Sequence, residues 1–348
     1  MSDTILINFF YAQPVGHAIE ALHYANGHHQ ADPTRRISVA LNNATPTELG
    51  DLCPFVEHTY AIDHPFLESG TNELTLPRDW DWVLDDPRRY QAFQTDAFPG
   101  MRDYYAASDA HLKPTQGRSI AGFGKLSYLP HQPLRLDVQA KELEQRTIAI
   151  MLAGSSDASL YPSEDAWRTI LDALHEAHPD VRPALIGRTA HDARTRSALD
   201  RGAFTDHPSN PLDAYDLPIE HQLQIVKASE LFLSPHTGFG LAALATGTPW
   251  LTISGGRWFE YYFNHVPFRS ILPDPERFPS FTQFSDADAT KSMCDERIAS
   301  DLDRIVTAAT ELLEGKLTYE QALDDYFTEL KTITSDIWSI DGVHLRYV

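Results

Sequence analysis

The sequence predicts an α/β protein made of two successive halves, each with a parallel sheet and crossover helices. Apolar, β-rich runs alternate with segments of helical spacing, which is the order that parallel strands with connecting helices require. This alternation begins at the first residues and restarts near the middle of the chain. The length of 348 residues agrees with two domains, because domains of roughly 150 residues are common.

The first half opens with a strand at residues 5–11 and a loop at residues 13–16. A helix is predicted at residues 17–26, where Ala18, Leu22 and Ala25 recur at helical spacing. Further strands are predicted at residues 37–41 and 80–84, and the second of these ends in Asp85 and Asp86.

The second half repeats this order with more elements. We predict strands at residues 147–152, 182–186, 230–234 and 250–253, and helices at residues 163–178, 219–228, 241–246, 296–315 and 318–333. A polar stretch at residues 137–144 marks the boundary between the halves. Open α/β sheets bind ligands beyond the carboxyl ends of their strands, so we expect function in those loops, in a cleft that the two halves face.

Charge and composition exclude several classes of function. There are 28 Lys and Arg against 49 Asp and Glu, for a formal charge of −21, and a binder of nucleic-acid backbones needs a basic surface instead. No run approaches the roughly 20 apolar residues that span a bilayer, and no secretory signal opens the chain. Cys53 and Cys294 are too far apart in sequence for a metal knuckle. We expect a cytoplasmic protein without a transmembrane segment.

Residues 234–249, SPHTGFGLAALATGTP, form the most informative segment. It follows a predicted strand and opens a helix, with Thr237, Gly238 and Gly240 at the junction. Free N–H groups and the helix dipole attract phosphate at such a junction, and small residues let the backbone approach it. His236 adds an imidazole that can donate to the same anion. The bland alternative is a tight turn with glycines used only for packing.

The same segment also fits a dinucleotide fingerprint. Gly238, Gly240 and Ala243 match G-x-G-x-x-A, with Glu260 near the distance expected of a ribose-binding acid. That fingerprint usually belongs to the first βαβ unit of its domain, whereas this segment comes late in the second half. An NAD(P)-dependent oxidoreductase is therefore the alternative enzyme class.

A second resemblance covers more of the chain. Residues 234–249 resemble the signature of family 9 glycosyltransferases, the heptosyltransferase-like group with the GT-B fold, which typically reads D-S-G-P-M-H-L-A-A-A-L-G-T-P. His236, Thr237 and Gly238 stand where that family has D-S-G, and the closing G-T-P follows without a gap. The lead-in KASELFLS and the loop at residues 153–157 are also similar. A histidine before the glycine resembles the diphosphate contact of family 1 glycosyltransferases.

The resemblance implies two Rossmann-like domains: an acceptor-binding domain at residues 1–140 and a nucleotide-sugar-binding domain at residues 141–315. Helices at residues 316–348 would pack back on the first domain. It also implies an inverting, metal-independent transfer of a hexosyl or heptosyl group from a nucleotide-diphosphate sugar to an acceptor hydroxyl. The nucleotide sugar is then a substrate, and no cofactor is needed. The other alternative is a non-catalytic GT-B relative that acts as a binding protein.

This reading assigns roles to individual residues. His17 follows the first-strand loop and would act as base, because a helix N-terminus favours the neutral imidazole. Asp85 and Asp86 would meet the acceptor or orient His17. Gly154, Ser155 and Arg188 would join His236, Thr237, Gly238 and Gly240 at the diphosphate, with Glu260 also assigned to the nucleotide. Asp79 and Asp81 are the alternative for a metal site.

Overall fold

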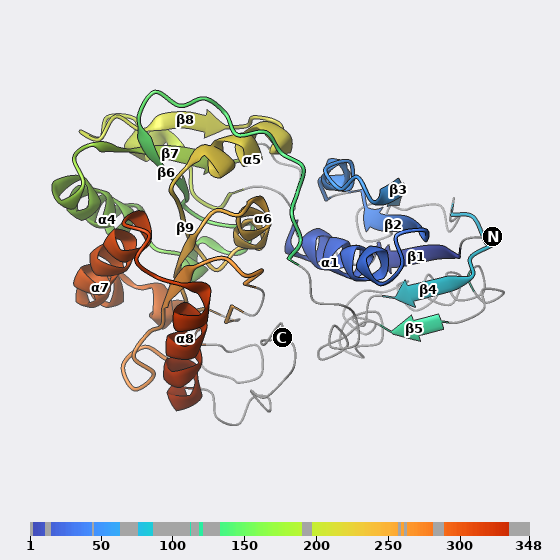
Figure 1. Cartoon of the computed structure of the whole chain (residues 1–348). Helices are drawn as coiled ribbons and strands as arrows, with labels where there is room; N and C mark the ends of the chain where they lie inside the picture. The colour runs from blue at the N-terminus through green and yellow to red at the C-terminus, as the bar shows by residue number, and fades with distance from the viewer. Residues whose placement is uncertain are drawn as a thin grey trace. The chain divides into compact units, whose positions relative to one another are not determined.

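The computed structural model describes most of the chain. The described residues are 3–10, 15–43, 45–62, 76–85, 112, 118–120, 133–189, 197–256, 259–260, 263–280 and 289–333. The chain divides into two compact units between Asp137 and Val138. Each unit contains one parallel sheet, which confirms the α/β prediction (Figure 1).

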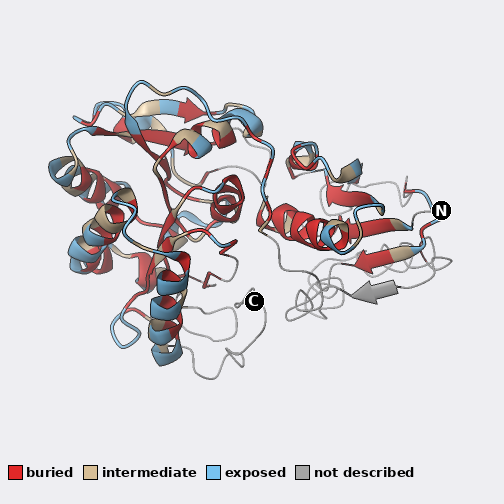
Figure 2. Cartoon of the chain, viewed as in Figure 1, coloured by how far each residue is buried: buried red, intermediate tan, exposed pale blue. Residues whose placement is uncertain are grey.

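The first unit is built on a five-stranded sheet with the order β3-β2-β1-β4-β5. Its strands are β1 (Thr4–Phe9), β2 (Arg36–Asn42), β3 (Val56–Ile62), β4 (Trp82–Asp85) and β5 (Arg118–Ile120). Helix α1 (Val15–Ala31) packs on β1 and β2. Strands β1 and β2 are almost wholly buried (Figure 2), as expected of parallel strands covered on both faces.

The second unit is built on a six-stranded sheet with the order β11-β10-β9-β6-β7-β8. Its strands are β6 (Arg146–Met151), β7 (Val181–Gly187), β8 (Leu212–Tyr215), β9 (Leu231–Pro235), β10 (Trp250–Ile253) and β11 (Phe268–Ile271). Its helices are α4 (Glu164–Ala177), α5 (Ile219–Ala228), α6 (Gly238–Thr246), α7 (Asp295–Leu313) and α8 (Tyr319–Ile333).

The alternating side chains of this sheet serve two helix layers. Ile148 and Ile150 of β6 join one core with the apolar faces of α4 and α7, including the fully buried Trp167. On the other face, α5 and α6 pack together, and Phe239 of α6 contacts Phe232 of β9. This core fixes the strands in place, so the loops that follow the strands can carry functional residues.

Helix α8 packs against the edge strand β11 within the second unit. Tyr326 meets the ring of Phe268 edge-on, with 5.6 Å between the ring centroids. Residues 334–348 lie outside the described residues, so the predicted packing of the C-terminal segment on the first half stays a prediction. Covering β11 also protects an edge that would otherwise be open to strand pairing.

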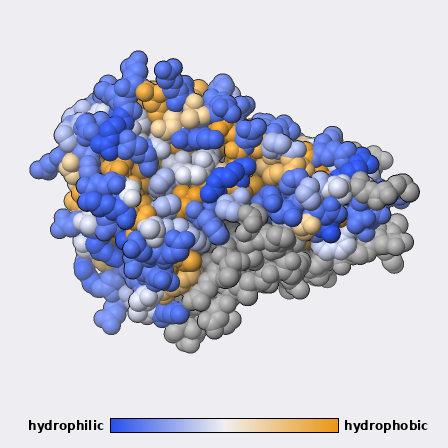
Figure 3. All heavy atoms as spheres, in the orientation of Figure 1, coloured by the Kyte–Doolittle hydropathy of each residue, from blue (hydrophilic) through white to orange (hydrophobic). Residues whose placement is uncertain are grey.

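Hydrophilic residues cover most of the described surface seen in Figure 3. Among the described residues, no helix has both the length and the apolar character needed to cross a membrane.

Candidate functional site

Each sheet has a switch point, where neighbouring strands connect outward in opposite directions. In the second unit this point lies between β6 and β9: the chain runs from β6 to β7 and β8 on one side, and from β9 to β10 and β11 on the other. In the first unit it lies between β1 and β4. Ligands of open α/β sheets bind in the crevice that the diverging loops leave at such a point.

The turn from β9 to α6 stands at the switch point of the second unit. Helix α6 begins at Gly238, three residues earlier than the sequence predicted, with Thr237 as its N-cap. Thr237 is 6% exposed, and its side chain makes no capping hydrogen bond. Its Oγ1 is buried and has no hydrogen-bond partner in the described structure. The first N–H groups of a helix also lack partners within the helix, so this turn can accept an anion.

The loop after β6, to which the predicted Gly154 and Ser155 belong, lies against this turn. A side chain at Gly154 would place its Cβ 3.4 Å from Cγ2 of Thr237 and 2.7 Å from the Tyr161 hydroxyl. The Tyr161 hydroxyl therefore excludes a side chain at residue 154, and the loop lies at ordinary contact distance from Thr237. The adjacent Ser155 is exposed. These two loops therefore lie next to each other at the switch point.

Arg188 follows β7, the next strand along from β6. It is exposed, and its turn is tied to the Gly154 loop by one short segment. The Ser197 N–H donates to the Arg188 carbonyl at 2.8 Å, and the Ala198 N–H donates to the Gly154 carbonyl at 2.9 Å. The structure thus brings the predicted Gly154 and Arg188 to the same edge of the sheet.

His236 and Glu260 form a hydrogen-bonded pair, and Glu260 lies in the protein interior. The carboxylate is fully buried; one oxygen accepts from His236 Nδ1 at 3.1 Å and the other from Ser254 Oγ at 2.8 Å. Tyr326 Oη donates to the Glu260 carbonyl at 2.8 Å. A ribose-binding acid needs its oxygens for the sugar, whereas these are already engaged. The geometry places Glu260 behind His236, where it fixes the ring through Nδ1.

Gly240 lies in the first turn of α6 and faces the sheet. A Cβ at this position would overlap the indole ring of Trp250. Trp250 is itself fully buried and donates from Nε1 to Ser234 Oγ at 3.0 Å. Gly240 therefore has a packing role, which is the alternative to anion binding that the sequence also allowed. It also weakens the dinucleotide fingerprint, whose second glycine should face the pyrophosphate.

At the switch point of the first unit, two buried polar side chains bridge neighbouring strands. Asn8 of β1 pairs in register with Asp85 of β4, and Asn8 Nδ2 donates to Asp85 Oδ1 at 2.7 Å. Both residues are fully buried. His17 is half-buried in the first turn of α1, the helix that follows β1. Asp86 lies outside the described residues.

Sequence reasoning missed Asn8. The available signal was a single amide within the otherwise apolar run of β1, TILINF. A buried amide needs a partner, so its position near the carboxyl end of a strand indicates a polar site there.

The alternative metal pair lies at the opposite edge of the first sheet. Asp81 precedes β4 and accepts from Thr4 N–H at 2.8 Å and from Thr4 Oγ1 at 2.9 Å. These bonds tie the amino ends of β1 and β4 together, which is a structural role. Across the described parts of the chain, no group of three or more His, Cys, Asp or Glu side chains is placed to hold a metal ion.

Comparison with solved structures identifies the fold that this chain resembles. No family model and no curated protein matches the sequence. A glycosyl transferase family 9 structure from Veillonella parvula DSM 2008 is similar at 11% identity and a TM-score of 0.59, over 90% of this chain and 97% of that one. The ADP-heptose lps heptosyltransferase II of E. coli follows at 11% identity and a TM-score of 0.55, over 89% and 100%.

A third similar structure is the iron-containing dodecameric glycosyltransferase TibC from enterotoxigenic E. coli, at 13% identity and a TM-score of 0.52. It is matched over 89% of this chain and 80% of that one. At such identities the likeness establishes the fold. It confirms the predicted GT-B architecture of two Rossmann-like domains and the resemblance to family 9 glycosyltransferases.

Proposed function

We propose that this chain transfers a glycosyl group from a nucleotide-diphosphate sugar to an acceptor hydroxyl, with inversion and without a metal ion. The observation that carries the proposal is the turn from β9 to α6. It combines a helix N-terminus, a buried hydroxyl without a partner on Thr237 and the His236 imidazole, all at the switch point of the second sheet. Phosphate is the chemical group that this combination of donors fits best.

The donor diphosphate would be held by the second unit. Backbone N–H groups at the start of α6 and the Thr237 hydroxyl would donate to the phosphate nearer the sugar. Because Glu260 engages Nδ1 of His236, a phosphate would meet the ring at Nε2. Arg188 would contribute a guanidinium from the neighbouring loop. Fixed donors of this kind stabilise the charge that develops on the departing diphosphate, which is the task a metal ion performs elsewhere.

The acceptor hydroxyl would be activated in the first unit. His17 lies in the first turn of α1, where the helix dipole favours the neutral ring over the cation. A neutral imidazole can take the proton of the attacking hydroxyl. Asn8 fixes one oxygen of Asp85, so this carboxylate is held in place to orient His17 or the acceptor.

Calorimetric titration with UDP, GDP, ADP, dTDP and NAD tests the donor site. We expect one diphosphate to bind and His236→Ala to weaken it about 10-fold or more, as for a hydrogen bond to a charged group. His221→Ala is the matched control, because His221 is exposed on α5. Binding of NAD alone would instead support the oxidoreductase alternative.

Turnover tests the base. Release of the nucleoside diphosphate from the matching nucleotide sugar should fall about 100-fold or more in His17→Ala, while binding of the free diphosphate stays unchanged. Equal turnover in His17→Ala and the wild-type protein would contradict the role of His17. Nucleotide binding without turnover towards any nucleotide sugar would favour a non-catalytic GT-B relative.

A further inference from the structure

The turn that follows β7 is fixed through its backbone. Ser197 closes it on one side: its N–H donates to the Arg188 carbonyl at 2.8 Å, and its Oγ accepts from the Arg188 N–H at 3.3 Å. Gly187, which ends β7, has a φ of 153° and would clash with Ser197 and Tyr215 if it carried a side chain. The backbone of Arg188 is therefore held in one conformation, while its side chain is exposed.

Asp216, after β8, closes the other side of the same turn. Its N–H donates to the Gly187 carbonyl at 3.0 Å, and its Oδ1 accepts from the Thr189 N–H at 2.7 Å. Its second oxygen, Oδ2, accepts from the Thr189 hydroxyl. Asp216 has a left-handed backbone with a φ of 59°, which Asp adopts more readily than most residues. Three hydrogen bonds thus join Asp216 to the residues on either side of Arg188.

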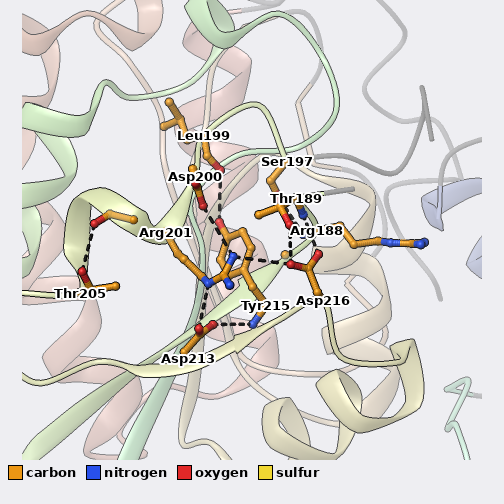
Figure 4. A network of polar contacts seen from close by, with 12 residues as sticks. Arg188, Thr189, Ser197, Leu199, Asp200, Arg201, Thr205, Asp213, Tyr215 and Asp216 are labelled. Carbon is orange, nitrogen blue, oxygen red and sulfur yellow. Dashed lines mark hydrogen bonds and ion pairs between the residues drawn. The ribbon is translucent and has the colours of Figure 1, made fainter. Parts of the chain in front are cut away.

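Arg201 supports Asp216 from behind. It lies 3.6 Å from Asp216 Oδ2, and it donates from Nε to Asp213 Oδ2 at 2.8 Å. Its guanidinium stands 5.2 Å above the Tyr215 ring centroid. Figure 4 shows these residues on one side of the turn and the Arg188 side chain leading away from them. Arg201 shares its single positive charge among Asp200, Asp213 and Asp216, so it offsets only part of the Asp216 charge.

We infer that Asp216 is a positioning residue for Arg188, acting through Thr189 to aim the guanidinium at the diphosphate of the donor. This inference rests on the proposed function. A residue whose backbone must become ordered when it binds an anion loses conformational freedom, so a backbone that is fixed beforehand removes that part of the cost of binding.

The test is a double-mutant cycle on the binding of nucleoside diphosphates and of inorganic pyrophosphate. Arg188→Ala should weaken binding about 10-fold. Asp216→Asn, which keeps the size and one acceptor oxygen, should weaken it about threefold to tenfold, and should add nothing in the Arg188→Ala background. Asp213→Asn is the matched control, because it removes a carboxylate from the same Arg201 network and leaves the three hydrogen bonds of Asp216 to Gly187 and Thr189 in place. It should leave binding unchanged.

A second measurement reports the mobility of the Arg188 side chain in the absence of a ligand. The ¹⁵N relaxation order parameter of the Arg188 Nε–H should fall in Asp216→Asn and stay unchanged in Asp213→Asn. Fully additive losses in the cycle, an equal loss in Asp213→Asn, or an unchanged order parameter in Asp216→Asn would each overturn the inference. If no diphosphate binds the wild-type protein, the proposed function fails, and the order parameter alone decides the role of Asp216.

Discussion

Replacing Thr237 with valine should make the protein more stable and a poorer binder of diphosphate. Thr237 is 6% exposed, and its Oγ1 has no hydrogen-bond partner in the described structure. Its backbone is extended, with φ −139° and ψ 152°, a conformation that β-branched valine adopts easily. Thr237→Val therefore exchanges a buried hydroxyl for a methyl group of the same shape and changes little else.

The two effects can be estimated separately. A buried polar group without a partner costs about 1–3 kcal/mol, and no capping hydrogen bond exists here to be lost. The free energy of unfolding should thus rise by about 1 kcal/mol or more. A hydroxyl that donates to a phosphate oxygen contributes about 1.5–3 kcal/mol. Its removal should weaken diphosphate binding by about 10-fold to 150-fold.

Urea unfolding followed by circular dichroism measures the first effect, and calorimetric titration with the nucleoside diphosphate measures the second. Thr252→Val is the matched control, since Thr252 of β10 is also fully buried with an unpartnered Oγ1. It should raise stability and leave binding unchanged. A loss of stability in Thr237→Val would show that the hydroxyl has a partner after all. A gain in stability with unchanged affinity would remove Thr237 from the donor site.

Three further predictions concern the rest of the molecule. Gly240→Ala should lower the free energy of unfolding by about 1–3 kcal/mol in urea, because the new methyl group overlaps Trp250. Burial, followed by the charge of Arg35, lowers the pKa of His28 to about 4. As the pH falls, His28 is therefore protonated in the unfolded state before it is protonated in the folded state. The free energy of unfolding should fall by about 3 kcal/mol between pH 6.5 and about 4. His28→Gln should flatten this part of the urea-derived stability profile. Burial raises the pKa of the Cys53 thiol to about 12, so iodoacetamide should leave it unmodified in the native protein while labelling it in urea.

Each of these has an opposite outcome that would contradict its cause. Alanine usually stabilises a helix relative to glycine by up to about 1 kcal/mol, so a gain in Gly240→Ala would mean that α6 can move away from Trp250. A profile between pH 4 and 6.5 that is unchanged in His28→Gln would assign the loss to other groups. Rapid native alkylation of Cys53 would show that the first unit opens locally.

The sequence was most informative where the spacing of apolar residues matches the buried face of an element. Strand β10 and helix α5 were predicted with the bounds that the structure shows, Trp250–Ile253 and Ile219–Ala228. Ser163, where the predicted helix begins, caps α4 by accepting from the Ala166 N–H at 3.1 Å. In these elements the apolar spacing matches the buried face, so local pattern and tertiary packing agree.

Strands β3, β5, β8 and β11 were missed because their patterns are weak or, in β5, only three residues long. The run of β3, VEHTYAI, carries polar residues and is mostly exposed or half-buried, as suits a strand at the edge of its sheet. In β11, Arg269 interrupts four residues and pairs with Glu311 of α7 and Asp325 of α8. Its partners lie far along the chain, where no local window can include them.

For the candidate site, too, the sequence was informative about which loops lie together and uninformative about contacts between distant side chains. The resemblance placed Gly154 and Thr237 at one site, and in the structure the two residues lie close together because they follow neighbouring strands. The sequence did not predict contacts between side chains. The spacing of Glu260 suggested a ribose contact, whereas its oxygens accept hydrogen bonds from His236 and Ser254. A residue type and its distance along the sequence do not determine which way a buried carboxylate points.

The order of strands also determines when the ligand sites can form during folding. The pairing at each switch point joins segments that are remote in sequence: Asn8 bonds to Asp85, 77 residues away, and Ile148 pairs with Leu231. Local steps such as α1 packing on β1 can precede these long loop closures, which carry a large entropic cost. Partly folded chains should therefore contain much of their helical structure before the strands at either switch point have paired. A nucleotide could then stabilise only the last folding step, by slowing unfolding rather than by accelerating collapse.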